Sequence, residues 1–204
     1  MDMGRPYTAV CPTLDSEVLA VLAGTRRPMT GREVARLTGR SPRGVLEVLS
    51  RLAEHGLVDR GEAGRALLFT LNREHVAAPA VDALAGMRAE LLRRIREAVA
   101  SWEVHPVNVS LFGSTARGEG DTHSDIDLFV VRPDEVTDED AQWRSQVDDL
   151  ARKIQRWTGN HASVAEAAKG EITRPRWNER PIAEELRSDA IVLGGIDLHH
   201  LPKD

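Results

Sequence analysis

The stretch LFGSTARGEGDTHSDIDLFVV, residues 111–131, decides the fold of the larger part of this chain. An apolar run ends at Gly113 and Ser114, a turn containing glycine and arginine follows, and a second apolar run opens with Asp125 and Asp127. Because side chains alternate across a strand, both aspartates point to one face while the intervening apolar residues pack on the other. The pattern predicts two strands joined by a turn, with a carboxylate pair beside that turn.

The residue types at this turn favour a phosphate ligand and a cation. Gly113 allows a ligand to approach the backbone closely, and Ser114 offers a hydroxyl and an amide at an expected helix start. Two neighbouring carboxylates repel each other unless a cation lies between them. Mg²⁺ is the cation that takes one or two carboxylates together with substrate phosphates. The turn therefore predicts a metal-dependent site for a nucleoside triphosphate.

The segment GSTARGEGDTHSDIDL resembles the signature of the nucleotidyltransferase superfamily that includes polymerase β, and most of all its minimal, stand-alone branch. The resemblance covers about residues 80–196 and implies a small mixed sheet with flanking helices. In that family the paired aspartates hold two metal ions, which implies that Asp125 and Asp127 are catalytic metal ligands for Mg²⁺. Arg117 would reach a phosphate or anchor the loop. The nucleotide-binding residues implied in this way are Gly113, Ser114, Arg117 and Ser124.

The third acid of the family pattern is the weak point of the resemblance. It belongs on a later strand, which is expected here over residues 161–166. Ser163 stands where the acid is common, and Glu166 is the nearest carboxylate. With Glu166 at the metals the catalytic set is complete. With Ser163 in place of the acid, a nucleotide is bound without efficient transfer.

The first third of the chain resembles the winged helix-turn-helix of bacterial regulators over residues 13–72. Three helical patterns and a hairpin expected over residues 57–71 follow one another. Thr30 and Glu33 have the spacing of a capping box, and Ser41 precedes a proline at the first helical position. By this resemblance the third helix enters the major groove and the wing meets phosphates. The DNA-binding residues implied are Arg43, Glu47, Arg51, Arg60 and Arg65. Dimerisation or protein docking is the alternative use of such a module.

Length and charge divide the chain of 204 residues into two modules. Residues 1–75 hold 11 basic and 9 acidic side chains, whereas residues 76–204 hold 16 and 23. We predict a winged helix-turn-helix domain over 1–75, and a connector helix at 79–103 with the nucleotidyltransferase domain over 76–204. The connector could also form a homodimer. No apolar run approaches the roughly 20 residues of a membrane span, and no signal peptide is recognisable, so a cytoplasmic protein without a membrane partner is expected.

The sequence predicts an α+β protein with two function hypotheses. The first is a Mg²⁺-dependent nucleotidyltransferase that moves a nucleoside monophosphate from a nucleoside triphosphate to an acceptor hydroxyl, with an attached DNA-binding module. Its acceptor is a partner protein, an RNA end or a small molecule, and an antitoxin that acts on a partner toxin belongs to this class. The second is a transcription regulator whose nucleotidyltransferase-like domain only senses a nucleotide. The position of Glu166 is expected to separate the two hypotheses.

Overall fold

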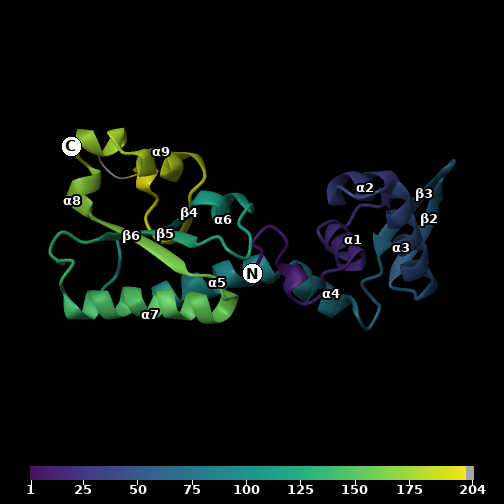
Figure 1. Cartoon of the computed structure of the whole chain (residues 1–204), viewed down its shortest axis with the longest axis horizontal. Helices are drawn as coiled ribbons and strands as arrows, with labels where there is room; N and C mark the ends of the chain where they lie inside the picture. Colours follow the sequence, from purple (N-terminus) through teal and green to yellow (C-terminus); the bar gives the residue numbers. More distant parts are fainter. Residues whose placement is uncertain (201–204) are drawn as a thin grey trace. The chain divides into compact units, whose positions relative to one another are not determined.

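The computed structural model describes residues 1–200 of the chain, with mixed α and β structure as predicted (Figure 1). Two compact units divide these residues. The first unit is Arg5–Arg88, and the second combines Met1–Gly4 with the chain from Ala89 onward. No helix within residues 1–200 has both the length and the apolar character to cross a membrane.

The first unit has the three helices and the hairpin of a winged helix. Thr30 caps α2 through its hydroxyl, which accepts from the Glu33 amide, while the Glu33 carboxylate accepts from the Thr30 amide at 2.7 Å. This capping box lowers the pKa of Glu33 to about 2, chiefly through the Thr30 amide. Ser41 caps α3 with its hydroxyl alone, which accepts from the Gly44 amide at 3.2 Å. Both predicted caps are thus confirmed. The elements are η1 (Pro6–Ala9), α1 (Leu14–Ala23), β1 (Met29–Thr30), α2 (Gly31–Thr38), α3 (Pro42–Glu54), β2 (Val58–Ala63), β3 (Ala66–Leu71) and α4 (Ala78–Ala85).

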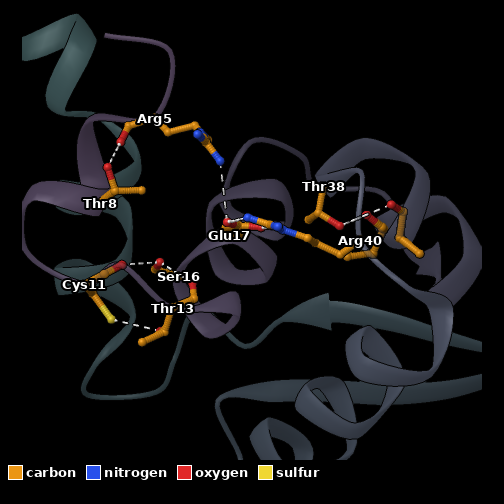
Figure 2. A network of polar contacts seen from close by, with 10 residues as sticks. Arg5, Thr8, Cys11, Thr13, Ser16, Glu17, Thr38 and Arg40 are labelled. Carbon is orange, nitrogen blue, oxygen red and sulfur yellow. Dashed lines mark hydrogen bonds and ion pairs between the residues drawn. The ribbon is translucent and has the colours of Figure 1, made fainter. Parts of the chain in front are cut away.

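A buried acid fastens α1 to the turn between α2 and α3 (Figure 2). The Glu17 carboxylate accepts two bonds from the Arg40 guanidinium, at 2.6 and 2.7 Å, and Arg5 lies 3.8 Å from the same carboxylate. The side chain of Glu17 is only 9% exposed. The bond to Arg40 lowers the pKa of Glu17, so this carboxylate is held in its charged form. Two arginines therefore balance one buried acid in the first unit.

The predicted connector helix over 79–103 is wrong in one respect, because the helix is interrupted at Gly86. Helix α4 ends there, with the Gly86 amide bonded to the Asp82 carbonyl, and α5 (Met87–Ala100) begins afterwards. Helix α4 packs against α1. For this reason the first unit extends to Arg88 and not only to residue 75.

The second unit is built on a four-stranded mixed sheet of order β6-β5-β4-β7. β4 is antiparallel to both β5 and β7, whereas β5 and β6 are parallel and are connected by α7. A parallel pair needs such a crossover, because a tight turn can join only antiparallel strands. The elements are β4 (Asn108–Phe112), α6 (Gly113–Arg117), β5 (Ile126–Arg132), α7 (Ala141–Thr158), β6 (Ala162–Ala168), α8 (Lys169–Ile172), η2 (Pro175–Glu179), α9 (Pro181–Ser188), β7 (Ile191–Gly195) and η3 (Leu198–His200).

The two faces of this sheet bury different helices. α5 and α7 cover one face, where Ile126, Leu128 and Val130 join a core that also contains Trp143. On the other face, η2 and α9 cover Phe129 and Val131 through a smaller core (Figure 1). Since side chains alternate along β5, Asp127 lies on the same face as Phe129 and α9. The site is therefore expected on the face of α9 and not on the face of α7. The smaller core consists of Phe129, Val131, Ala167, Trp177, Ala183 and Leu186.

Candidate functional site

The aspartate pair lies at the start of β5, next to the end of β4. Asp127 is the second residue of β5 and is paired in register with Phe112, the last residue of β4. Asp125 lies two residues earlier, just before the strand. Its side chain is 53% exposed, and its Oδ1 is 3.9 Å from Nδ1 of His161. One carboxylate is therefore exposed and the other is half-buried in the sheet.

Gly113 lies against Asp127 in a way that no other residue could. Its φ of +69° is in the left-handed region that favours glycine. A Cβ at this position would be only 2.7 Å from Oδ2 of Asp127. The backbone of the turn thus lies directly against the carboxylate, which occupies the place that a side chain at residue 113 would need. Ser114 follows as the second residue of the short helix α6.

Negative charge accumulates at this site. The pKa of Asp127 is raised, first by burial of its carboxyl group and then by the negative charges of Asp125 and Glu185. Each of these causes disfavours the charged carboxylate. A divalent cation would reverse the effect, so the donor set fits a hard cation that prefers oxygen ligands. Among residues 1–200, no group of three or more His, Cys, Asp and Glu side chains is gathered closely enough to hold a metal. Asp125 and Asp127 are the two carboxylates that such a cation would contact first, because the charge of one raises the pKa of the other.

The turn between β4 and β5 is held by its own polar contacts. Ser124 exchanges two hydrogen bonds with Asp121, as donor to its Oδ1 at 2.9 Å and as acceptor from its amide at 3.0 Å. The buried side chain of Asn160 donates to the carbonyls of both residues. Thr115, also buried, donates its hydroxyl to the carbonyl of Asp125 at 3.2 Å. Asn160 and Thr115 could not be identified from the sequence, because hydrogen bonds between residues far apart in the chain leave no local sequence pattern.

Arg117 anchors the turn to another element. Its guanidinium contacts Glu119 at 2.9 Å and Asp189 at 3.2 Å, and Asp189 immediately follows α9. These acids raise the pKa of Arg117. Of the two predicted roles for Arg117, the structure displays the anchoring one. This ion pair joins α6, beside the aspartates, to the end of α9.

Glu166 does not lie with the aspartates, which corrects the predicted placement. It is paired in register with Val130, and its carboxylate accepts a 2.6 Å bond from the indole Nε1 of Trp143. Trp143 belongs to α7, on the opposite face of the sheet from Asp127. Ser163 is the β6 residue in register with Asp127. The two-residue period of the strand therefore brings Ser163 toward the aspartates and turns Glu166 away.

The residues predicted for DNA binding are grouped at α3 and the wing. Arg43, Glu47, Arg51 and Arg65 line one groove between α2, α3 and the hairpin, together with the exposed apolar side chain of Leu46. Two of the arginines are already paired, Arg43 with Glu47 at 3.0 Å and Arg51 with Asp15. Arg60 lies on β2, outside the residues that line the groove. The positive charge of this face of the winged helix is therefore smaller than its number of arginines indicates, because two of them are paired with acids.

Comparison with known protein families assigns the second unit. The model of the family described as "Nucleotidyltransferase domain" matches residues 92–173, which include β4, the turn, both aspartates and β6. The chain carries a nucleotidyltransferase domain. A second family model, described only as HVO_A0114, matches residues 13–76, most of the winged helix. No curated protein gave a significant match.

Solved structures resemble the chain only weakly. A mutant of ZitR from Lactococcus lactis is 24% identical over 41% of this chain, with a TM-score of 0.33. A MarR-family transcriptional regulator from Rhodococcus sp. RHA1 is 22% identical over 43% of this chain, also at 0.33. RV1404 from Mycobacterium tuberculosis is 23% identical over 50%, at 0.35. The chain covers 56%, 63% and 73% of these structures, respectively. The assignment of the nucleotidyltransferase domain depends on none of them.

Proposed function

We propose that the chain is a Mg²⁺-dependent nucleotidyltransferase that moves a nucleoside monophosphate from a nucleoside triphosphate to an acceptor hydroxyl. The observation that supports this best is the contact of the turn with the carboxylate pair. Gly113 lets the backbone of the turn lie directly against the Asp127 carboxylate, and Asp125, two residues before Asp127, presents a second carboxylate to solvent. A phosphate chain and a cation need these two features side by side.

The residues of the chain would act mainly by positioning. Asp125 and Asp127 would hold the cation, and the open backbone at Gly113 would accept the phosphates, with Ser114 and Ser124 at the two ends of the turn. Arg117 would keep the turn fixed through its ion pair with Asp189. When bound, Mg²⁺ neutralises the triphosphate and polarises the reacting phosphoryl group. Such a reaction asks for little covalent chemistry from the protein.

The placement of Glu166 supports a second candidate function. With Glu166 bonded to Trp143, the family's third acid is missing from its strand. A domain that binds a nucleotide without turning it over would suit a DNA-binding regulator, with the nucleotide as its signal.

The acceptor in the first function, the nucleotidyltransferase, is a partner protein, an RNA end or a small molecule.

Calorimetric titration of the four ribonucleoside triphosphates with Mg²⁺ tests the site. Wild type should bind at least one of them in a magnesium-dependent manner, and the variant Asp125→Ala/Asp127→Ala should lose this binding. Equal binding by both proteins would refute the proposed site. Pyrophosphate release after addition of acceptors then separates the enzyme, which releases it, from the sensor, which does not.

Duplex DNA is the ligand proposed for the winged helix. The wing presents Arg60 on β2 and Arg65 at the hairpin turn, both exposed. If each meets a phosphate, its replacement by alanine should lower the slope of log affinity against log salt by about one. Arg152→Ala on α7, where the side chain is 67% exposed, is the control and should leave the slope unchanged. Unchanged slopes for both wing variants would favour docking or dimerisation as the role of this module.

A further inference from the structure

A long groove runs along α3 in the winged helix. On the side of α3 it is lined by Arg43, Leu46, Ser50 and Glu54, which are three or four residues apart and therefore share one side of the helix. The lining extends from the first turn of α3 to its last residue, a length of roughly 18 Å at about 1.5 Å per residue. The start of α2 and the hairpin complete the groove, which has a volume of about 1240 Å³. These dimensions fit an elongated partner better than a small molecule, whose pockets measure about 300–1,000 Å³.

The floor of this groove is apolar. Leu46 on α3 is 42% exposed, although leucine is among the residues most often buried. Ala66, Leu67 and Phe69 of β3 line the groove with it. Gly31, at the start of α2, lies against Leu46 without a side chain of its own, since a Cβ there would be 3.6 Å from Cδ1 of that leucine. An apolar floor along a helix is the kind of surface that receives the apolar face of a second helix.

The rim of the groove carries an excess of positive charge. Four arginines and two glutamates line it. Arg43 is paired with Glu47 at 3.0 Å. Arg32 on α2 and Arg65 at the hairpin turn are exposed and form no ion pair with any residue in the described range 1–200. Acidic side chains of a partner would complement these two cations, which come from two different elements.

We propose that this groove docks an amphipathic helix of a partner protein, with apolar residues against Leu46 and β3 and acidic residues toward Arg32 and Arg65. Phosphates and base edges of DNA require polar contacts, which an apolar floor does not supply. The inference does not depend on the nucleotide site. Because Arg65 is also a proposed DNA contact, a helix in the groove would compete with duplex DNA for the wing.

Fluorescence anisotropy of labelled peptides, measured on the full chain, tests this inference. The probe is a peptide of about 14 residues, roughly four helical turns, with leucine at positions i, i+3, i+4 and i+7 and glutamate around them. It should bind, whereas the same peptide with lysine in place of glutamate should bind at least about tenfold more weakly, because like charges then meet at the rim. No binding by the glutamate peptide, or equal binding by the lysine peptide, would overturn the inference.

Substitutions with matched controls locate the binding. Leu46→Asp should weaken binding of the glutamate peptide at least about tenfold, because it removes the apolar contact and adds a like charge. Leu37→Asp on α2, at a leucine that is 52% exposed but outside the groove lining, should bind as wild type does. Arg32→Ala should weaken binding by about 2–5-fold, the size of an exposed ion pair, and Arg36→Ala, exposed on α2 outside the groove lining, should not. Equal binding by the two aspartate variants would refute docking in this groove.

Two further measurements separate other occupants of the groove. In amide spectra, the glutamate peptide should shift the signals of Gly31, Leu46 and Ala66. If a DNA duplex of about 20 base pairs shifts these signals and the peptide does not, the groove belongs to the DNA-binding surface, so the inference is overturned and the proposed DNA binding stands. If wild type self-associates in sedimentation and Leu46→Asp abolishes this while Leu37→Asp does not, the occupant is a second copy of the chain, which also overturns the inference.

Discussion

At the scale of single residues, Gly113 is the position where the site tolerates least change. Gly113→Ala places a Cβ 2.7 Å from Oδ2 of Asp127 and strains a backbone at φ +69°. We expect a loss of about 1–2 kcal/mol of stability from the backbone and, because the carboxylate is displaced, at least about tenfold weaker magnesium–nucleotide binding. Thermal unfolding and calorimetry measure the two effects. Gly159→Ala has the same backbone cost at φ +78° with open space around it, so it should lose stability alone.

A second prediction at this scale concerns the charge of Asp127. Its pKa is raised in the folded protein, so its ionisation opposes folding. A raised folded pKa contributes stability that is present below the unfolded pKa and lost as pH rises through the folded pKa. At pH 7 and in EDTA, Asp127→Asn should therefore melt at a higher temperature than wild type. With Mg²⁺ and a nucleotide present the order should reverse, because only wild type gains stability from binding. The same order in both buffers would show that no cation acts on Asp127.

The residues around the aspartates mark how far the sequence could predict the site. Asp125, Asp127 and Gly113 lie within one continuous stretch, so strand alternation and the glycine were enough to place them together. Glu185, whose negative charge helps to raise the pKa of Asp127, is about 60 residues away along the chain, so no local pattern connects the two. Glu166 was placed wrongly because its face depends on the register of β6 with β5, which the sequence alone does not give.

At the scale of elements, the pair Glu17–Arg40 holds the winged helix together. Because the bond to Arg40 lowers the pKa of Glu17, the contribution of this acid is present above its unfolded pKa and is lost as pH falls through the folded pKa. Glu17→Gln should cost about 1.5–3 kcal/mol at pH 7, the range for a hydrogen bond to a charged group. The cost should shrink when the pH is lowered below the usual range of a glutamate. A cost that does not change between pH 7 and pH 3 would contradict this account.

The same scale shows which elements the sequence predicts well. Caps at Thr30 and Ser41 were predicted correctly because each depends on side chains within three residues of the helix start. The break at Gly86 was missed because the apolar spacing continues across it, and a glycine within a helical pattern does not by itself end a helix. Here the Gly86 amide closes α4 on the Asp82 carbonyl, and a Cβ would lie 3.0 Å from that oxygen.

At the scale of the whole molecule, the chain passes between its two units twice, at Gly4–Arg5 and at Arg88–Ala89. The first residues therefore belong to the second unit. The Met3 amide donates to the Gly120 carbonyl at 2.6 Å, and the Met3 side chain is 1% exposed in the core beneath the sheet. A first domain over residues 1–75 was predicted from the charge distribution and the winged-helix resemblance, neither of which gives information about such a return.

This arrangement predicts that a substitution near the N-terminus lowers the stability of the second unit, although most of that unit begins only at residue 89. Met3→Ala should destabilise the nucleotidyltransferase domain by about 2–5 kcal/mol, the usual cost of truncating a buried methionine, and should loosen the turn that carries Gly120. Hydrogen exchange should then become faster in β4 and β5 and stay unchanged in α1 and α3. Met29→Ala, at a residue that is 2% exposed in the core of the first unit, should give the opposite pattern. Faster exchange in α1 and α3 of the Met3 variant would instead mean that the two units unfold as one, because a cavity in one core would then lower the stability of both.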